Sequence, residues 1–561
     1  MASALCITVS AEGSSSVMRV QYGEEVKEFD IFDDGWNFAM EQAEEGKEVI
    51  VTLLKDWKAD DGQFTDDFFN GAGFDWAAIY FAADVNVTLD LNGHTIDRGL
   101  IAPEANGEVM FINDNANVTI KNGTITGGYS NNGAGGIHIK NANVNLIDLV
   151  FTGNRVLDDD GAAIQHVDGG KLSMKNCRFE NNNCSVVGLP IYGTVYLEKV
   201  RSVLIEDCYF GNNSGISYGG GIYAENIGSF RINNSTFENL EALQSGGAIW
   251  VSGMSNSLSI YRCTFNNNSC QSDATLNDML GYYGGAIYAQ GVGLYIDDST
   301  FTGNYAGWDG GAIYFKECPR SSLKRCTFDG NKAGWDGGAI FLNDASVVLT
   351  WGCEFINNEA VETGGAIYID SGCDVDLADV GSDPSVVKYN KAGEIGGGVF
   401  QHEDCKELYI GGEVYVCENV SSKGDDDLYI EDYYNFHIGY IESPEKSIGI
   451  RCKDDNGGEV AKFAHYVRDF MLDSFFANNE GMEISLMPRV ASDGYRENFL
   501  GISKPETVGS VFGEGSLTMI VALVAIVGLV TSVVSICLIA DMKKKTARVA
   551  ADNTAETDDE E

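Results

Sequence analysis

Acidic side chains recur beside glycine corners and could do chemistry. Asp160, Asp309 and Asp336 each stand directly before such a corner, and Glu362 and Glu394 stand one residue earlier relative to theirs. On neighbouring strands, carboxyl groups would lie about 5 Å apart, which fits the paired carboxylates of a retaining glycosidase. Asp309 and Asp336, however, belong to the exact repeat AGWDGGAI, which favours a structural role in which Asp accepts backbone N–H groups. Catalysis by this acidic row is therefore the alternative hypothesis.

Aromatic residues form the second candidate site, because one follows the β-branched anchor of nearly every repeated GGAI motif. If the anchor points inward, strand alternation turns the next residue outward, and a row of rings beside acids could bind a glycan or a protein. A register shift of one residue would instead bury the row as a packed ladder, and an outward row could merely cover the sheet. The candidate binding residues are Tyr196, Tyr223, Trp250, Tyr288, Trp308, Tyr314, Trp335, Phe341 and Tyr368, and Phe400 continues the row.

The anchors that must position these residues return ten times, and most lie 27 residues apart. A fixed period of this size indicates a solenoid. Each gap between anchors would then be one coil, so equivalent residues of the motif would form rows along the axis. The anchors are Ile137, Ile164, Val195, Ile222, Ile249, Ile287, Ile313, Ile340, Ile367 and Val399.

Each repeat predicts three short strands and three corners. In residues 246–269 the strands begin at Ile249, at Leu258 and at Cys263, and a spacing of three residues between the second and third strands breaks the alternation. An Asn follows three residues after most third-strand Phe residues; Asn tolerates left-handed backbone, and stacked amides can bond along the axis. The sequence thus predicts an all-β, three-sided parallel β-helix of about a dozen coils, on the order of 60 Å long. These Asn residues are Asn154, Asn182, Asn213, Asn268, Asn304, Asn331 and Asn358.

The GGAI and FxxN motifs resemble the repeats of polymorphic outer-membrane proteins over roughly residues 130–400. The resemblance implies a right-handed parallel β-helix, surface display and adhesion. The chain lacks the C-terminal transmembrane barrel of that family and has a single hydrophobic segment instead. Residues 34–57 and 89–99 look like uncharacterised β-helix surface proteins of gut Firmicutes.

The charge of the chain restricts its partners. Acidic residues outnumber basic ones 83 to 37, giving a net charge of −46, which argues against nucleic acid or anionic lipid as a partner for a basic face. The DDD runs lack the spacing of known calcium loops, and no Cys/His metal spacing occurs, so we expect no metal and no cofactor. His138, His166 and His402 fall at different offsets from the anchors and share no site.

Fourteen cysteines could indicate a disulfide scaffold. Five of them occupy one place in the third strand, which Ser or Leu fills in other coils, so we expect a small buried site with free thiols. Bridges between Cys177 and Cys208 and between Cys326 and Cys353 are the alternative, because neighbouring coils bring Cα atoms into disulfide range. The five are Cys177, Cys208, Cys263, Cys326 and Cys353.

The two ends of the chain predict export and a membrane anchor. Residues 517–540 carry no charge and are long enough to span a bilayer, and the lysines at 543–545 place the C-terminus inside. Residues 1–11 resemble the end of a signal peptide. We expect an N-terminal cap over 12–60 with a helix over 35–46, the β-helix over 61–424, irregular terminal coils over 425–500, a spacer over 501–516 and a cytoplasmic tail over 541–561.

Together these features predict a cell-surface rod with one transmembrane helix that binds an extracellular glycan or protein. A polysaccharide lyase or glycoside hydrolase is the first alternative, and it predicts acids in one irregular cleft. A passive surface stalk is the second, and it predicts a featureless outer face with buried aromatic residues.

Overall fold

A parallel β-solenoid of about 13 turns makes up the first of two compact units, Met1–Ser503 and Lys504–Glu561. The computed structural model describes residues 16–59, 77–184, 190–254, 256–271, 281–350, 352–378, 383–442, 447–453, 458–463, 472–490 and 496–504. The predicted signal segment over 1–11, the transmembrane span over 517–540 and the tail over 541–561 lie outside these ranges. Among the described residues, no helix combines the length and the apolar character that crossing a membrane requires.

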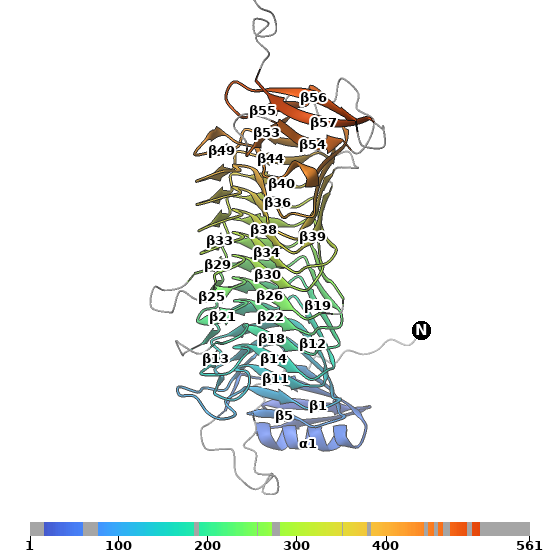
Figure 1. Cartoon of the computed structure of the whole chain (residues 1–561). Helices are drawn as coiled ribbons and strands as arrows, with labels where there is room; N and C mark the ends of the chain where they lie inside the picture. Colours follow the sequence, from blue (N-terminus) through green and yellow to red (C-terminus); the bar gives the residue numbers. More distant parts are fainter. Residues whose placement is uncertain are drawn as a thin grey trace, which may run out of the picture. The chain divides into compact units, whose positions relative to one another are not determined.

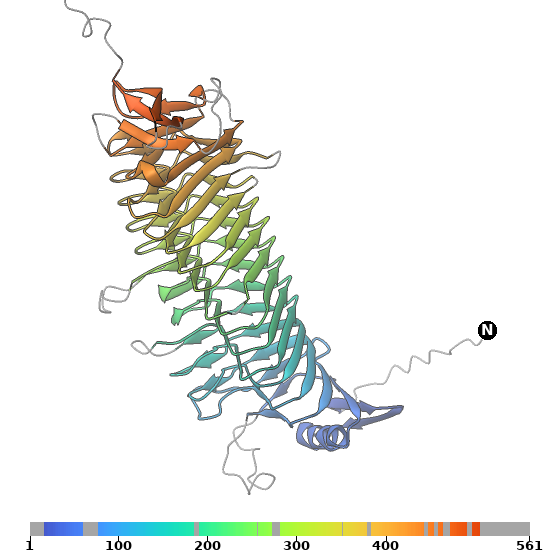
Figure 2. The same cartoon turned by 45° about the vertical axis from the view of Figure 1, so that its right-hand side comes forward.

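Three parallel ladders run along the unit, as the three predicted strands of each repeat require (Figures 1 and 2). Each strand pairs in parallel with its equivalent one coil away, so Ile313 lies opposite Ile340. The predicted all-β parallel solenoid is thus confirmed.

The first ladder carries the anchors. It consists of β5 (Ile79–Phe81), β8 (Met110–Ile112), β11 (Ile137–Lys140), β14 (Ile164–Val167), β18 (Val195–Glu198), β22 (Ile222–Glu225), β26 (Ile249–Ser252), β30 (Ile287–Gln290), β34 (Ile313–Lys316), β38 (Ile340–Asn343), β42 (Ile367–Ile369), β46 (Val399–Gln401), β51 (Leu428–Ile430), β53 (Ile448–Cys452) and β55 (Phe475–Ala477).

The second ladder follows the first corner of each coil. It consists of β3 (Glu48–Leu53), β6 (Asn86–Asp90), β9 (Asn117–Thr126), β12 (Asn143–Thr152), β15 (Lys171–Lys175), β19 (Ser202–Glu206), β23 (Phe230–Asn233), β27 (Leu258–Tyr261), β31 (Leu294–Asp297), β35 (Ser321–Lys324), β39 (Ser346–Thr350), β43 (Asp374–Ala378), β47 (Glu407–Gly412), β52 (Phe436–Ile441) and β54 (Gly458–Phe463).

The third ladder carries the Phe residues. Strands β9 and β12 of the second ladder continue through the corner into the third ladder. Its other strands are β4 (Trp57–Lys58), β7 (Thr95–Asp97), β16 (Arg178–Glu180), β20 (Tyr209–Gly211), β24 (Thr236–Glu238), β28 (Thr264–Asn266), β32 (Thr300–Thr302), β36 (Thr327–Asp329), β40 (Glu354–Ile356), β44 (Ser385–Lys388) and β48 (Val414–Cys417).

A fourth, very short ladder, divided into a three-stranded and a nine-stranded sheet, was not predicted. Its strands have mostly two residues, too few for a hydrophobic period, and they follow the FxxN motif on the way to the glycine corner. They are β10 (Tyr129–Ser130), β13 (Arg155–Val156), β17 (Asn183–Cys184), β21 (Ile216–Tyr218), β25 (Glu241–Ser245), β29 (Ser269–Cys270), β33 (Tyr305–Ala306), β37 (Lys332–Ala333), β41 (Glu359–Ala360), β45 (Lys391–Ala392), β49 (Val420–Ser421) and β50 (Gly424–Asp425).

The core lies inside the coils, where equal positions of the motif stack on one another. The anchors from Ile137 to Val399 are fully buried or nearly so. Eight Phe rings of the third ladder, from Phe151 to Phe355, stack with centroids 4.7–4.9 Å apart. Burial of this regular apolar column fixes the register of the strands, because a slip of one residue would turn every inward side chain outward.

The Asn residues of the FxxN motif are buried and form the predicted amide ladder along the axis. Asn304 Nδ2 donates to Asn331 Oδ1 at 2.9 Å and to the carbonyl oxygen of Phe265 at 3.1 Å. The left-handed backbone belongs to the residue before each Asn, such as Gly303 or Asn357. The prediction was therefore right about amide stacking but wrong about which residue turns the chain.

The five cysteines of the third-strand slot are buried and form no disulfide bond, as the shared slot predicted. Four of their sulfur atoms, all but that of Cys208, lie against carbonyl oxygens of the neighbouring coil, as in Cys263 Sγ to Ile232 O at 3.5 Å. The alternative pairs, Cys177 with Cys208 and Cys326 with Cys353, are not bridged in the structure.

At the N-terminal end, helix α1 (Phe32–Glu44) replaces the helix expected over 35–46. It begins three residues earlier because Phe32 is part of its buried face, and Trp36 packs on Phe81 of the solenoid. Strand β1 (Met18–Tyr22) pairs antiparallel with β2 (Glu25–Phe29) and with β3. Strands β3 and β4 already pair in parallel with β6 and β7, so the coils begin before residue 61. A capping role for α1 stays a prediction.

At the C-terminal end, the coils continue beyond residue 424 through β51, β52 and β53. A 3-10 helix η1 (Tyr433–Asn435) interrupts them, and an antiparallel pair, β56 (Glu483–Val490) and β57 (Arg496–Ser503), closes the described part. Strand β57 reaches residue 503, within the expected spacer, because it also pairs with β54.

Candidate functional site

The aromatic residues after the anchors form one continuous row, named here the outward row. The residues on either side of each, the anchor and the third residue of the strand, are buried in the core, so alternation turns the row away from it. The predicted outward orientation is thus correct. The row continues further than predicted through Tyr429, and beyond an interruption at Gln165 the same position again holds rings in Tyr80, Phe111 and His138.

Most of the outward row is nevertheless covered, which corrects the expectation of an exposed stripe. Tyr223, Tyr288, Tyr314 and Phe341 are only 7–8% exposed, and the rest of the predicted row is half-buried or buried. The rings stack on one another with centroids 4.3–5.8 Å apart. Because ring faces are paired within the row, only ring edges and hydroxyl groups remain to meet a ligand.

A second row of side chains from the glycine corners, named here the corner row, lies over the outward row. It contains the predicted acids and, in other coils, tyrosines that sequence reasoning missed. Tyr283 packs 4.5 Å from Tyr314, and Tyr192 packs 4.7 Å from Tyr223. The signal was present in the sequence, because each of these tyrosines stands directly before a left-handed glycine, as the acids do. The row reads Asp160, Tyr192, Tyr218, Ser245, Tyr283, Asp309, Asp336, Thr363 and Ile395.

The carboxyl groups of the corner row bond to the backbone of the next coil. Asp309 Oδ1 accepts the N–H of Asp336 at 3.2 Å, and Asp336 Oδ1 accepts the N–H of Thr363 at 2.8 Å. Asp160 does the same for Tyr192 at 2.9 Å. This is the structural role that the exact repeat favoured, although the N–H group comes from the neighbouring coil.

These three acids have unusual protonation behaviour. Burial raises the pKa of Asp160, Asp309 and Asp336 to about 7, and for Asp309 the nearby Asp336 carboxylate adds to the effect. A carboxyl group that keeps its proton near neutral pH can donate a hydrogen bond or act as a general acid. Glu362 and Glu394 are exposed and lie one residue before the corner row.

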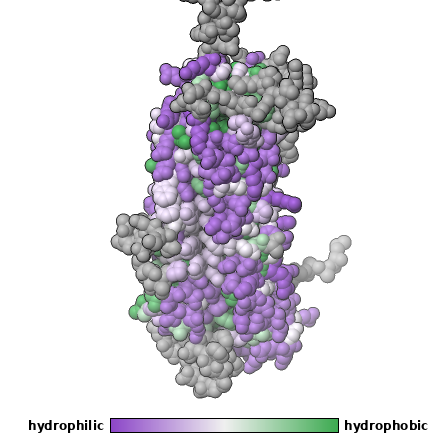
Figure 3. Space-filling view, in the orientation of Figure 1, coloured by the Kyte–Doolittle hydropathy of each residue, from purple (hydrophilic) through white to green (hydrophobic). Residues whose placement is uncertain are grey.

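Trp308 and Trp335 stand directly before two acids of the corner row, and this pair is open to solvent. Their indole rings stack with centroids 4.4 Å apart, and Trp335 is 42% exposed. Trp308 in turn packs edge-on against Tyr283. The pair thus forms a supported aromatic platform directly before Asp309 and Asp336. In the space-filling view, the described surface is mostly hydrophilic, with scattered hydrophobic patches (Figure 3).

The three histidines lie in different environments, as their different offsets predicted. His138 belongs to the outward row and packs against Phe111 with its ring tilted, whereas His166 is fully buried. Burial lowers the pKa of both imidazoles to about 4, so both are neutral. Among the described residues, no group of three or more His, Cys, Asp or Glu side chains is arranged to hold a metal ion.

Comparison with known proteins identifies the family. The model of a right-handed β-helix region matches residues 74–219 and 193–381, which together span more than half of the chain. The chain belongs to the right-handed β-helix family. No match was found among curated proteins or among solved structures.

Proposed function

We propose that this protein is a surface-displayed binding rod whose ligand is an extracellular glycan or protein. A right-handed β-helix fits both a surface rod or binding protein and a polysaccharide-acting enzyme. The resemblance of the GGAI and FxxN repeats to polymorphic outer-membrane proteins, and of the N-terminal segments to Firmicutes surface proteins, supports surface display. The predicted span over residues 517–540 would hold the rod on the membrane, with its N-terminal part outside.

The Trp308–Trp335 platform is the observation on which the binding proposal rests. The Trp335 indole is stacked and 42% exposed, and Trp is enriched among the residues that dominate binding surfaces. One face of the Trp335 ring rests on Trp308, and Glu362 takes the equivalent place in the next coil, so the exposed part of the indole is the surface that a sugar can contact. Asp309 and Asp336 add carboxyl groups that can hydrogen-bond to sugar hydroxyls.

The test is a glycan-binding screen with the full-length chain in detergent. We expect at least one neutral or basic oligosaccharide to bind, and the variant Trp335→Ala to weaken that binding by about tenfold or more. The matched control is Tyr295→Ala, which removes a 46% exposed ring from the second ladder, and it should bind like the wild type. A screen without a Trp335-dependent ligand would favour the passive stalk.

The enzyme alternative is favoured by one observation, the two neighbouring acids whose pKa lies near 7. It predicts that the protein depolymerises a polysaccharide and that Asp309→Asn or Asp336→Asn abolishes the activity. Both acids bond to the backbone of the next coil, which is why we place binding before catalysis. Formation of new reducing or unsaturated ends, measured over hours, distinguishes the two.

A further inference from the structure

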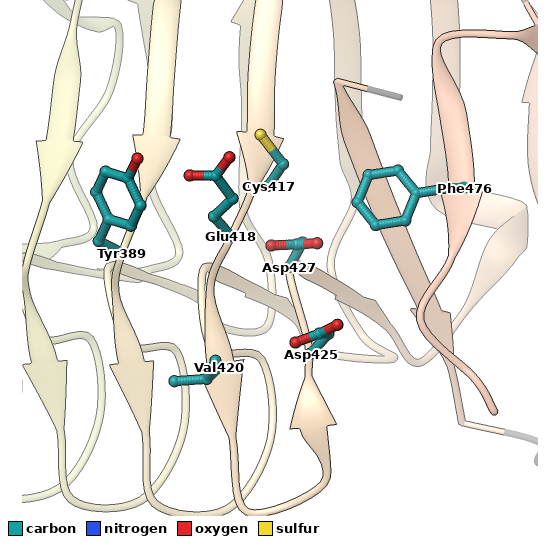
Figure 4. Close-up of a pocket in the computed structure, with 7 residues that line it drawn as sticks. All are labelled: Tyr389, Cys417, Glu418, Val420, Asp425, Asp427 and Phe476. Atoms are coloured by element: carbon teal, nitrogen blue, oxygen red, sulfur yellow. The ribbon is translucent and has the colours of Figure 1, made fainter. Parts of the chain in front are cut away.

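A pocket of about 590 Å³ opens at the C-terminal end of the solenoid, far along the chain from the Trp308–Trp335 platform. It lies where the Asn ladder stops, because Asp427 Oδ1 accepts both the N–H and the Nδ2 group of Asn419. Tyr389, Glu418 and Asp427 come from successive coils, and Phe476 of β55 closes the other side (Figure 4). Its volume is within the range of small-molecule sites.

Two residues of the pocket depart from the pattern of their row. In the eight preceding coils, the left-handed corner before the Asn ladder is a Gly or an Asn, from Gly153 to Asn357. In the last two coils it is Tyr389 (φ +59°) and Glu418 (φ +63°), and Tyr389 is the one aromatic residue with positive φ in the part of the chain that the structure describes. An aromatic residue such as Tyr389 disfavours that conformation, so its presence calls for a role other than turning the chain.

The pocket is lined by acidic side chains. Glu418, Asp425 and Asp427 line it, and no basic side chain does so among the described residues. Two cations lie close to these carboxylates. Arg451 pairs with Asp426 at 3.3 Å, and Lys388 lies 4.0 Å from Glu418 with its ammonium group over the ring of Tyr415.

Two aromatic rings flank these carboxylates. Figure 4 shows Tyr389 on one side and Phe476 on the other, with Glu418 and Asp427 between them. Tyr389 is 59% exposed, so its ring is available to a ligand. Aromatic faces attract organic cations, and carboxylates accept hydrogen bonds from an ammonium group. We propose that this pocket binds a small organic ammonium ion with an apolar body.

The test uses 2-phenylethylamine as the probe and 2-phenylethanol as its neutral isostere, titrated into the full-length chain in detergent by calorimetry. We expect the amine to bind at least about tenfold more tightly than the alcohol. The variants Tyr389→Asn and Glu418→Asn should each weaken amine binding by about tenfold or more. They restore the residue used at this corner in Asn357, so they should melt no lower than the wild type.

The matched control is Gly330→Asn, which lies in the same row of left-handed residues before the Asn ladder but outside the pocket and should leave binding unchanged. Partition of the amine into detergent is common to all variants and subtracts out. The proposal would be overturned if amine and alcohol bound equally, or if Tyr389→Asn and Glu418→Asn left amine binding unchanged. It would also be overturned if both variants melted at a lower temperature than the wild type, because the two residues would then be structural.

Discussion

At the scale of single residues, the Asn ladder shows how a buried polar group is made stable. Asn331 donates to Phe301 O and to Asn358 Oδ1, and it accepts the N–H and the Nδ2 group of Asn304. Each coil therefore satisfies groups of its two neighbours. Leu240 interrupts the ladder, and its N–H still bonds to Asn268 Oδ1 at 3.2 Å.

We expect Asn331→Ala to lower the free energy of unfolding by at least about 2 kcal/mol, because each buried group left without a partner costs about 1–3 kcal/mol. Asn331→Leu should cost less, because it fills the space as Leu240 does. Denaturant unfolding measures both, with Thr300→Ala on the exposed side of β32 as the control. A loss for Asn331→Ala no larger than that of the control would contradict the ladder.

The buried carboxyl groups predict a dependence of stability on pH. In the folded protein, burial raises the pKa of Asp309 and Asp336 from 3.8 to about 7. The folded state therefore binds protons that the unfolded chain releases, so the contribution to stability is full below pH 3.8 and is lost as the pH rises through 7. The free energy of unfolding should fall between pH 4 and 7, and the double variant Asp309→Asn, Asp336→Asn should flatten this fall. An unchanged pH profile would show that the two pKa values are ordinary.

Residue identities predicted the rows well wherever one side chain type repeats. The anchors and the Phe stack follow from period and alternation alone. The tyrosines of the corner row were not predicted because only acidic residues were considered at this position. Tyr283 stands where other coils have an acid. The end of the Asn ladder was missed because Phe355 is the last ring of its stack, and Val387 and Val416 then precede Asn390 and Asn419.

At the scale of elements, the glycine corners set how closely two coils can approach. A Cβ atom on Gly338 would lie 2.1 Å from the carbonyl oxygen of Gly365 in the next coil, which is backbone that cannot move aside. At Gly330 (φ +65°), a Cβ atom would meet nothing within 4 Å. The two glycines are thus needed for different reasons, close approach and positive φ.

We expect Gly338→Ala to destabilise the protein by more than about 2 kcal/mol, because two coils must separate to admit the methyl group. Gly330→Asn should change stability by less than about 1 kcal/mol, since Asn adopts the left-handed conformation readily. Thermal unfolding of the two variants side by side makes the comparison. Equal effects would mean that contact between coils at this corner is looser than described.

At the scale of the whole molecule, the coils are interchangeable units of one period. Removing residues 314–340 would join Ile313 to Phe341 and keep every later residue on its own face, because Ile313 and Ile340 are register partners. We expect this variant to fold as a solenoid one coil shorter, judged by circular dichroism and cooperative unfolding. Removing residues 314–339 instead leaves one extra residue that a strand or a corner must absorb, so this variant should unfold at a lower temperature than the first. A lower unfolding temperature for the first variant than for the second would contradict the model of stacked, equivalent coils.

The overall architecture was predictable from the period, whereas the two ends were not. Strand β3 was assigned to a cap because it precedes the first clear repeat. The fourth ladder and the pocket at Tyr389 and Glu418 arise where strands have two residues or where the motif ends, and there periodicity carries no information.

The central claim is that equal positions of the motif stack as rows on neighbouring coils. Oxidative cross-linking of paired cysteines tests it most directly, because partners in a parallel ladder lie about 4.8 Å apart, within disulfide range. Tyr314→Cys combined with Phe341→Cys should form a disulfide, seen by mass spectrometry of the joined peptides. Tyr314→Cys combined with Tyr368→Cys spans two coils and should not. Cross-linking of the second pair, or none of the first, would contradict the account.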